Sequence, residues 1–192
     1  MNEEQGRKGK LFVFSGPSGV GKGTLRMRAL SGVPNLVYSI SCTTRAPRTG
    51  ERDGLDYWFI SKQDFEDKVA RGLFLEYAFV HGDFYGTLRE NIRRETEAGH
   101  DVMLEIDVQG ALQIRELLPE SILIFVQPPS LKVLEERLRL RGTESEDKIT
   151  QRLENAKQEM RQASKYDHVI VNDTLEQAAE ELRDVIISYR SK

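Results

Sequence analysis

The feature that most constrains this chain is a glycine-rich stretch directly after an apolar run. Residues 15–25 are S-G-P-S-G-V-G-K-G-T-L and follow the apolar letters L-F-V-F. The phosphate-binding pattern G-x-x-x-x-G-K-[ST] is matched at Gly16, Gly21 and Lys22. Position 23 departs from the pattern, because it is Gly rather than Ser or Thr, and Thr24 comes one residue late. The stretch predicts a strand, a tight turn and a helix start that together bind phosphate.

A loop of this kind binds phosphate because its backbone N–H groups point inward and the helix N-terminus adds partial positive charge. Glycines allow the tight backbone path, and Lys22 can reach the terminal phosphates. The alternative is an ordinary glycine-rich turn with one exposed lysine, and the strand and helix on either side favour the nucleotide site. The candidate ATP-binding residues are Gly16, Pro17, Ser18, Gly19, Val20, Gly21, Lys22, Gly23 and Thr24.

Gly23 raises the question of how a metal ion is held. The hydroxyl at this position ordinarily ligates Mg²⁺ in phosphate-loop enzymes. We therefore expect Mg²⁺ as the cofactor, carried by ATP oxygens and water, with Thr24 and Asp107 as candidate protein ligands. The G-K-G-T ending resembles the loop of adenylate kinases. The loop alone thus predicts a phosphate binder and leaves the acceptor open.

Composition restricts the classes of protein to consider. A chain of 192 residues suits one domain with small inserted lobes. The formal net charge of −3 argues against nucleic acid as a partner, and no segment approaches the ~18 apolar residues of a membrane span. The polar N-terminus lacks a secretory signal, and the single cysteine, Cys42, fits a reducing compartment. We expect a cytoplasmic protein without membrane partners.

Short apolar segments alternate with amphipathic ones along most of the chain. This alternation predicts an α/β fold with a parallel sheet covered on both faces, and the phosphate loop lies at the carboxyl end of its first strand. Residues 81–84, H-G-D-F, are expected to form a turn. The expected strands are 11–15, 37–41, 56–60, 73–80, 102–106, 121–126 and 168–171, and the expected helices are 23–30, 61–72, 88–98, 108–118, 131–141, 147–164 and 175–186.

Six motifs in order resemble the guanylate kinase family, over residues 10–190. They are S-I-S-C-T-T-R-A-P-R-T-G-E-R-D-G-L-D-Y-W-F, F-L-E-Y-A-F-V-H-G-D-F-Y-G-T, L-E-I-D-V-Q-G, F-V-Q-P-P-S, R-L-R-L-R-G-T-E-S-E-D-K-I-T-Q-R-L and H-V-I-V-N-D. The resemblance implies the P-loop nucleoside monophosphate kinase fold, in which helices flank a parallel sheet core. It places that core at 1–39, 98–134 and 161–192, a GMP-binding lobe at about 40–97 and a small helical lid at about 135–160.

The resemblance also implies an activity. Such an enzyme transfers the γ-phosphoryl group of ATP to GMP, and to dGMP, giving ADP and GDP in purine nucleotide metabolism. ATP and GMP are then the partners, and both a monomer and a homo-oligomer stay open. No general base is expected, because a phosphate monoester is largely ionised at neutral pH. The three histidines, His81, His100 and His168, are scattered and expected to be structural or at the surface.

By resemblance, the GMP phosphate would contact Arg45, Arg48 and Tyr57, with Tyr85 nearby. Arginine suits this role because its planar fork makes paired bonds to phosphate oxygens. The alternative is a solvated charged loop, which is the first expectation for Arg52, off the motif.

The guanine would face Ser41, Glu76, Thr87 and Asp107 in the related enzymes. A carboxylate can accept from the ring N–H and the amino group of guanine together, whereas adenine offers no such pair. The alternatives are an ordinary outward residue for Glu76 and a cap of the helix at 108–118, or a magnesium ligand, for Asp107.

The lid arginines of the family correspond to Arg137, Arg141 and Arg152. They would close over the transferring phosphate, with Lys22 and Arg45 as the further catalytic groups and Arg141 also at ATP. Residues 137 and 141 share one helical face, and the alternative is a solvated surface such as Glu135, Glu136 and Arg139 would provide. By resemblance Asn172 would lie near the adenine. We expect the lobe and the lid to close when both nucleotides bind.

Two other functions stay open at this stage. Guanylate-kinase-like domains also serve as non-enzymatic modules that bind phosphorylated peptides, and Gly23 favours that function, whereas Lys22 and the lid arginines oppose it. A kinase for another small phosphorylated metabolite would keep the loop and the arginines but lose the pair Ser41 and Glu76, which is present here.

Overall fold

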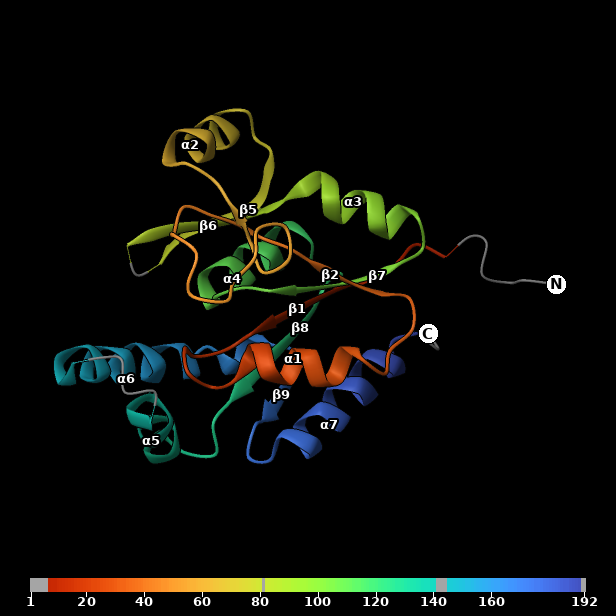
Figure 1. The fold of residues 1–192 in the computed structure, drawn as a ribbon. Coiled ribbons are helices and arrows are strands. Elements are labelled where there is room, and N and C mark those ends of the chain that lie inside the picture. Colours follow the sequence, from red (N-terminus) through yellow and green to blue (C-terminus); the bar gives the residue numbers. More distant parts are fainter. Residues whose placement is uncertain (1–6, 81, 141–144, 191–192) are drawn as a thin grey trace. The chain divides into compact units, whose positions relative to one another are not determined.

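The structure is a computed structural model that describes residues 7–80, 82–140 and 145–190 (Figure 1). Its larger sheet has five strands in the order β2 (Leu36–Ser39), β7 (Asp101–Glu105), β1 (Leu11–Ser15), β8 (Ile122–Gln127) and β9 (His168–Val171). The pairs β2–β7, β1–β8 and β8–β9 are parallel. All five residues of β1 are buried, as in a parallel sheet whose two faces are covered. The predicted α/β fold with a parallel sheet is confirmed.

The helices follow the predicted segments closely. Ser61 begins α2 as expected, since its hydroxyl accepts a hydrogen bond from the Asp64 N–H at 3.0 Å. The helix predicted to continue to residue 164 ends earlier, at Met160, and a short 3₁₀ turn follows at Ala163–Lys165. The helices are α1 (Lys22–Leu30), α2 (Lys62–Ala70), α3 (Arg89–Glu97), α4 (Val108–Leu117), α5 (Leu131–Leu140), α6 (Glu146–Met160) and α7 (Leu175–Ser188).

A second, four-stranded sheet was not predicted. Its order is β4 (Trp58–Phe59), β3 (Cys42–Thr43), β6 (Asp83–Leu88) and β5 (Phe74–Val80), and β5 and β6 form an antiparallel hairpin. Phe65 of α2 stacks on Phe74 and Phe84, at centroid distances of 4.4 and 5.2 Å, and so covers one face of this hairpin. The same face carries Cys42, which is 1% exposed. The prediction of a turn at residues 81–84 thus missed the strand that begins at Asp83.

The chain divides into two compact units by its packing. Unit 1 comprises the described residues of Met1–Leu11, Asn35–Leu104 and Gln109–Ser121, and unit 2 those of Phe12–Pro34, Glu105–Val108 and Ile122–Lys192. The small sheet lies in unit 1, and the glycine-rich loop with α1, α5, α6 and α7 lies in unit 2. In the described part of the chain, no helix combines the length and the apolar character needed to cross a membrane. The lobe at about 40–97 and the lid at about 135–160 stay predictions.

Candidate active site

The glycine-rich loop of unit 2 joins the buried strand β1 to α1. Gly21 precedes the first residue of the helix with φ 93°, a left-handed conformation that strains any residue with a side chain. At Gly16 an added Cβ would lie 2.1 Å from the carbonyl oxygen of Val126. Two of the pattern's glycines are therefore required by the backbone, one for its dihedral angle and one for its close approach to β8.

Lys22 is the first residue of α1, and its side chain folds back over the loop. The ammonium donates to the carbonyl oxygens of Gly16, at 2.5 Å, and Pro17, at 3.1 Å. Gly23 follows in ordinary helical backbone, and a Cβ there would meet nothing within 4 Å. Thr24 is exposed on the first turn. The Lys22 ammonium therefore lies against the loop backbone, and the structure has room for a side chain at position 23.

Residues far along the chain contact this loop within unit 2. The guanidinium of Arg152, on α6, lies 3.4 Å from the Ser18 hydroxyl. Asn172 is buried, and its side-chain amide donates to the Val20 carbonyl oxygen at 2.8 Å. Arg137 of α5 donates to the backbone carbonyl oxygen of Asn172 at 3.0 Å. The structure thus brings together the loop, Arg137, Arg152 and Asn172, whereas Arg141 lies outside the described residues.

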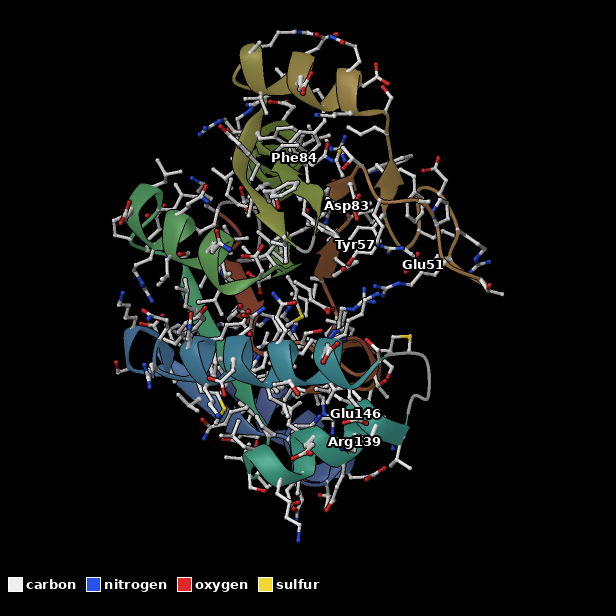
Figure 2. The ribbon with its side chains drawn as sticks, turned by 90° about the vertical axis from the view of Figure 1, so that its left-hand side faces the viewer. Glu51, Tyr57, Asp83, Phe84, Arg139 and Glu146 are labelled. Carbon is white, nitrogen blue, oxygen red and sulfur yellow. The ribbon has the colours of Figure 1, made fainter. Side chains whose placement is uncertain are left out.

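The other charged residues of α5 and α6 behave as a solvated surface. Arg139 bonds to Glu135, at 2.9 Å, and to Glu146, and Figure 2 shows Arg139 and Glu146 pointing toward each other. Beneath these residues an apolar cluster of Leu134, Leu138, Ile149 and Ala156 holds the two helices together. The charged-surface interpretation of Arg139 is confirmed.

Glu159, near the end of α6, is a titratable residue that the sequence analysis missed. Burial raises the pKa of its carboxyl to about 7, with the Lys22 ammonium acting to lower it and the Asp107 carboxylate acting to raise it. Glu159 is therefore in electrostatic contact with the loop lysine. Asp107 itself directly precedes α4 and belongs to unit 2.

In unit 1 a β-bulge decides where the candidate guanine ligand points. Phe74 pairs with Leu88 and Glu76 with Thr87, so that Leu75 is an extra residue in β5. In a regular strand Phe74 and Glu76, two positions apart, would share a face, because side chains alternate along a strand. The bulge instead leaves Phe74 on the side of α2 and turns Glu76 to the opposite face.

Glu76 is 3% exposed, and the fully buried Thr87 hydroxyl donates to its carboxylate at 2.6 Å. The alternative of an outward surface residue is therefore wrong. The Ser41 hydroxyl is also buried and, within the described part of the chain, has no hydrogen-bond partner. A buried polar group of this kind is uncommon in folded proteins and is explained when a ligand completes its bonding.

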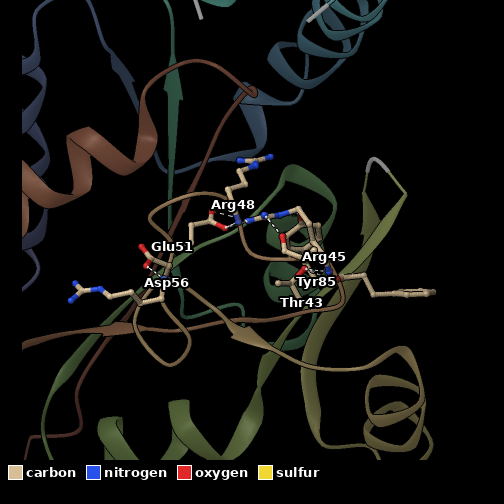
Figure 3. A network of polar contacts seen from close by, with 9 residues as sticks. Thr43, Arg45, Arg48, Glu51, Asp56 and Tyr85 are labelled. Carbon is tan, nitrogen blue, oxygen red and sulfur yellow. Dashed lines mark hydrogen bonds and ion pairs between the residues drawn. The ribbon is translucent and has the colours of Figure 1, made fainter. Parts of the chain in front are cut away.

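The same face of the small sheet carries Arg45 and Tyr85 (Figure 3). Nη2 of Arg45 donates to both carboxylate oxygens of Glu51, at 2.8 and 2.9 Å, and Nε of Arg45 donates to the Tyr85 hydroxyl at 3.2 Å. It also lies 5.5 Å from the ring centroid of Tyr57. Three side chains thus fix one guanidinium in a defined orientation.

The loop that holds Arg45 is closed by Glu51, which the sequence analysis did not select. Besides Arg45, the Glu51 carboxylate accepts from the Arg48 N–H at 2.7 Å. The Arg48 side chain itself is exposed. Arg52 is also exposed, and only its backbone is held, by the Asp56 carboxylate at 2.7 Å, in agreement with the solvated alternative given for it. An acidic residue six positions after the arginine was the available signal.

Comparison with known proteins decides which family has this combination of loop and sheet. The family model of guanylate kinase matches residues 8–189. The chain belongs to the guanylate kinase family. A guanylate kinase of Neisseria meningitidis serogroup A is 48% identical over 186 residues, which cover 97% of this chain and 91% of that protein. One from Symbiobacterium thermophilum is 46% identical over 185 residues, with coverages of 96% and 88%.

A solved structure supports the same assignment. The crystal structure of guanylate kinase from Anaplasma phagocytophilum matches with a TM-score of 0.82 at 32% identity, covering 97% of this chain and 88% of that one. The guanylate kinase family and its P-loop kinase fold, both expected from the motifs, are confirmed. In this guanylate kinase family member the described residues contain no group of three or more His, Cys, Asp or Glu side chains that could hold a metal.

Proposed function

We propose which residues carry the reaction of this guanylate kinase family member, which transfers the γ-phosphoryl group of ATP to GMP and gives ADP and GDP. We also propose that dGMP is accepted in place of GMP. The observation that carries the proposal is the set of polar groups in unit 1 that comprises the buried Glu76 carboxylate, the Arg45 guanidinium beside Tyr85 and the buried Ser41 hydroxyl, which has no partner among the described residues. The Glu76 carboxylate and the Ser41 hydroxyl can accept hydrogen bonds from a base that has adjacent N–H donors, and the Arg45 guanidinium can bind a phosphate. A cytoplasmic location accords with nucleotide substrates and with Cys42 as a buried thiol.

On the acceptor side, Glu76 would accept from the ring N–H and amino group of guanine, while Thr87 keeps its hydrogen bond to the carboxylate. Ser41 would complete its hydrogen bonding on the base. Arg45, Arg48, Tyr57 and Tyr85 would hold the phosphate, and Glu51 would keep the Arg45 fork oriented. Asp107 would contribute to the guanine site or to the metal.

On the donor side, the loop from Gly16 to Thr24 would surround the ATP phosphates with its N–H groups. Lys22 would leave the carbonyl oxygens of Gly16 and Pro17 for the terminal phosphates, which are stronger acceptors. Arg137, Arg141 and Arg152 would neutralise the transferring group, and Asn172 would hold the loop through Val20 close to the adenine. Mg²⁺ would be carried by the ATP oxygens, with Thr24 or Asp107 as protein ligands, and would neutralise phosphate charge.

The chemistry then needs no protein base. The acceptor phosphate is already ionised, so the side chains act by positioning two phosphates and by compensating their charge. Water must be excluded while this occurs, which is why we propose that the lobe at about 40–97 and the lid at about 135–160 close over the substrates. A scattering profile unchanged by GMP with a non-hydrolysable ATP analogue would contradict closure.

The test is an ADP-release assay with ATP and Mg²⁺ against GMP, dGMP, AMP, UMP and dTMP. We expect turnover with the two guanine nucleotides alone. Preference for any other acceptor would overturn the proposal. Lys22→Ala should reduce turnover by about 10²-fold or more, which would separate an enzyme from a phosphopeptide-binding module.

The guanine assignment has its own test. Glu76→Gln replaces an acceptor-only group by an amide that offers a donor toward guanine, and we expect kcat/KM for GMP to fall about 10–100-fold. Glu66→Gln on α2 is a matched control, because Glu66 is about half exposed and pairs only loosely with Lys62. Full GMP activity in Glu76→Gln would contradict the role given to this carboxylate.

A further inference from the structure

Gln113, on α4, makes a contact with the small sheet that the reaction described above does not use. Its side-chain N–H donates to the Tyr77 carbonyl oxygen at 3.0 Å, and its side-chain oxygen accepts from the Tyr77 N–H at 3.4 Å. Both residues belong to unit 1, with α4 beside strand β5 (Figure 1). One glutamine amide therefore satisfies both backbone groups of a single strand residue.

The Gln113 amide satisfies backbone groups of β5 that a neighbouring strand would otherwise bind. β5 is at the edge of the small sheet, with β6 on one side. Successive residues of an antiparallel strand point their backbone groups alternately toward and away from the partner strand. Since Tyr77 offers its N–H and C=O to Gln113, Glu76 and Ala78 point theirs toward β6. The amide of Gln113 thus acts as the neighbouring peptide that the edge lacks.

The restrained residue directly follows Glu76. The bulge at Leu75 interrupts the ladder immediately before Glu76, so pairing with β6 restrains the strand less on that side. The Gln113 contact restrains it on the other side, one residue later. We propose that Gln113 is a positioning residue for guanine recognition, which holds β5 at Tyr77 and thereby fixes the Glu76 carboxylate. This inference rests on the proposed role of Glu76.

A purely structural role for Gln113 makes a different prediction. Satisfying an exposed strand edge would add stability but would affect both substrates equally. A positioning role acts through Glu76 and therefore affects GMP alone. The distinction can be measured as a difference between the two KM values and as an energetic coupling between positions 113 and 76.

The experiment uses the full chain with Gln113→Leu, which loses both contacts, and Gln113→Glu, which keeps an acceptor but loses the donor to the Tyr77 carbonyl. We expect KM for GMP to rise about threefold to tenfold in both variants, with KM for ATP and kcat within about twofold of the parent. The control is Glu116→Leu, an exposed position on the same helix, which should change neither KM. Thermal unfolding fixes a temperature at which all variants are folded.

The coupling is measured with GMP dissociation constants from titration calorimetry. Gln113→Leu introduced into Glu76→Gln should weaken GMP binding by less than about twofold, since the group that it positions is already altered. An unchanged KM for GMP, an equal rise in both KM values, or an undiminished effect in the Glu76→Gln background would each overturn the inference. If Glu76→Gln itself leaves GMP binding unchanged, the proposed function of Glu76 fails instead, which is a separate outcome.

Discussion

The glycine-rich loop of unit 2 and the proposed acceptor face of unit 1 differ in the atoms that they offer to a ligand. The loop offers backbone N–H groups, and its demands on sequence are mainly steric, as at Gly16 and Gly21. The acceptor face offers side chains from several strands and one loop, and two of them are held by another side chain, Arg45 by Glu51 and Glu76 by Thr87. A change in the loop should therefore act through the backbone, and a change on the acceptor face through lost chemistry at one substrate.

Substitution of Gly16 is expected to have the largest effect on stability and activity among changes in the loop. In Gly16→Ala the new Cβ would lie 2.1 Å from the Val126 carbonyl oxygen, in a residue with φ 150°. Backbone must move, and we expect a loss of about 3 kcal/mol or more in the free energy of unfolding, with at least about a 10²-fold loss in kcat/KM for ATP. Urea unfolding and initial rates measure both. Gly23→Ala is the control, and near-parental behaviour of Gly16→Ala would contradict the steric argument.

On the acceptor face, Arg45→Lys keeps the charge and loses the fork. A lysine has a single ammonium nitrogen, which cannot replace both Nη2 at the Glu51 carboxylate and Nε at the Tyr85 hydroxyl. We expect KM for GMP to rise about 10–100-fold, with KM for ATP unchanged and stability lowered by less than about 1 kcal/mol. Steady-state kinetics in both substrates provide the measurement. Arg52→Lys should have no effect, and a parallel rise in KM for ATP would show that the two regions are not separable.

Burial of the Glu159 carboxyl gives the stability of unit 2 a pH dependence. Burial raises the pKa of this carboxyl from 4.5 to about 7, so the native state keeps a proton that the unfolded state has lost. The free energy of unfolding therefore decreases as pH rises from 4.5 to about 7 and stays reduced above that.

Glu159→Gln removes this dependence. The variant should be more stable than the parent by about 1–3 kcal/mol at pH ~8 and equally stable at pH ~4. Denaturant unfolding at the two pH values measures the difference. Glu154→Gln, exposed on the same helix, is the control. A stability difference that is the same at both pH values would contradict the assigned titration.

The smallest effect is expected at Gly23. A side chain there would meet nothing within 4 Å, so Gly23→Ser should fold normally and gain about 0.5 kcal/mol from helix propensity. Its hydroxyl would stand where phosphate-loop enzymes place a magnesium ligand, and we expect activity to saturate at lower Mg²⁺. Differential scanning calorimetry and Mg²⁺ titrations test the two parts. A lower unfolding temperature would show that the loop cannot accept a side chain there.

The sequence made the loop and most of the larger sheet predictable. Gly16, Gly21 and Lys22 occur in a fixed spacing, and β1 and β8 are apolar runs of five and six residues, short and rich in β-branched and aromatic residues, which favours strands over helices. Ser61 marked the start of α2 because its capping hydrogen bond is local. These features depend on neighbours within a few residues, which is why a single sequence reveals them.

Strand β6 and the bulge could not be predicted in the same way. Gly86 interrupts the strand pattern, and the reason for it is tertiary, since a Cβ there would lie 2.9 Å from the Phe74 ring. Glu51 and Glu159 were missed because each matters through another residue. Glu51 accepts a hydrogen bond from Arg45, and the Glu159 carboxyl interacts electrostatically with Lys22 only in the folded chain. For Glu76, the resemblance to a family gave a residue number, while burial and the Thr87 bond required coordinates.

The extra residue Leu75 has a consequence for how this family can change. The bulge shifts the alternation of side chains by one residue, so that odd-numbered and even-numbered positions exchange faces between the two sides of Leu75. Deletion of residue 75 would leave Phe74 opposite Leu88 and Glu76 opposite Thr87 as consecutive residues of a regular strand, so both side chains would keep their present faces. Deletion of residue 75 is therefore expected to be better tolerated than deletion of a regularly paired residue of β5 such as Tyr77, which would turn the side chains on one side of it to the opposite face.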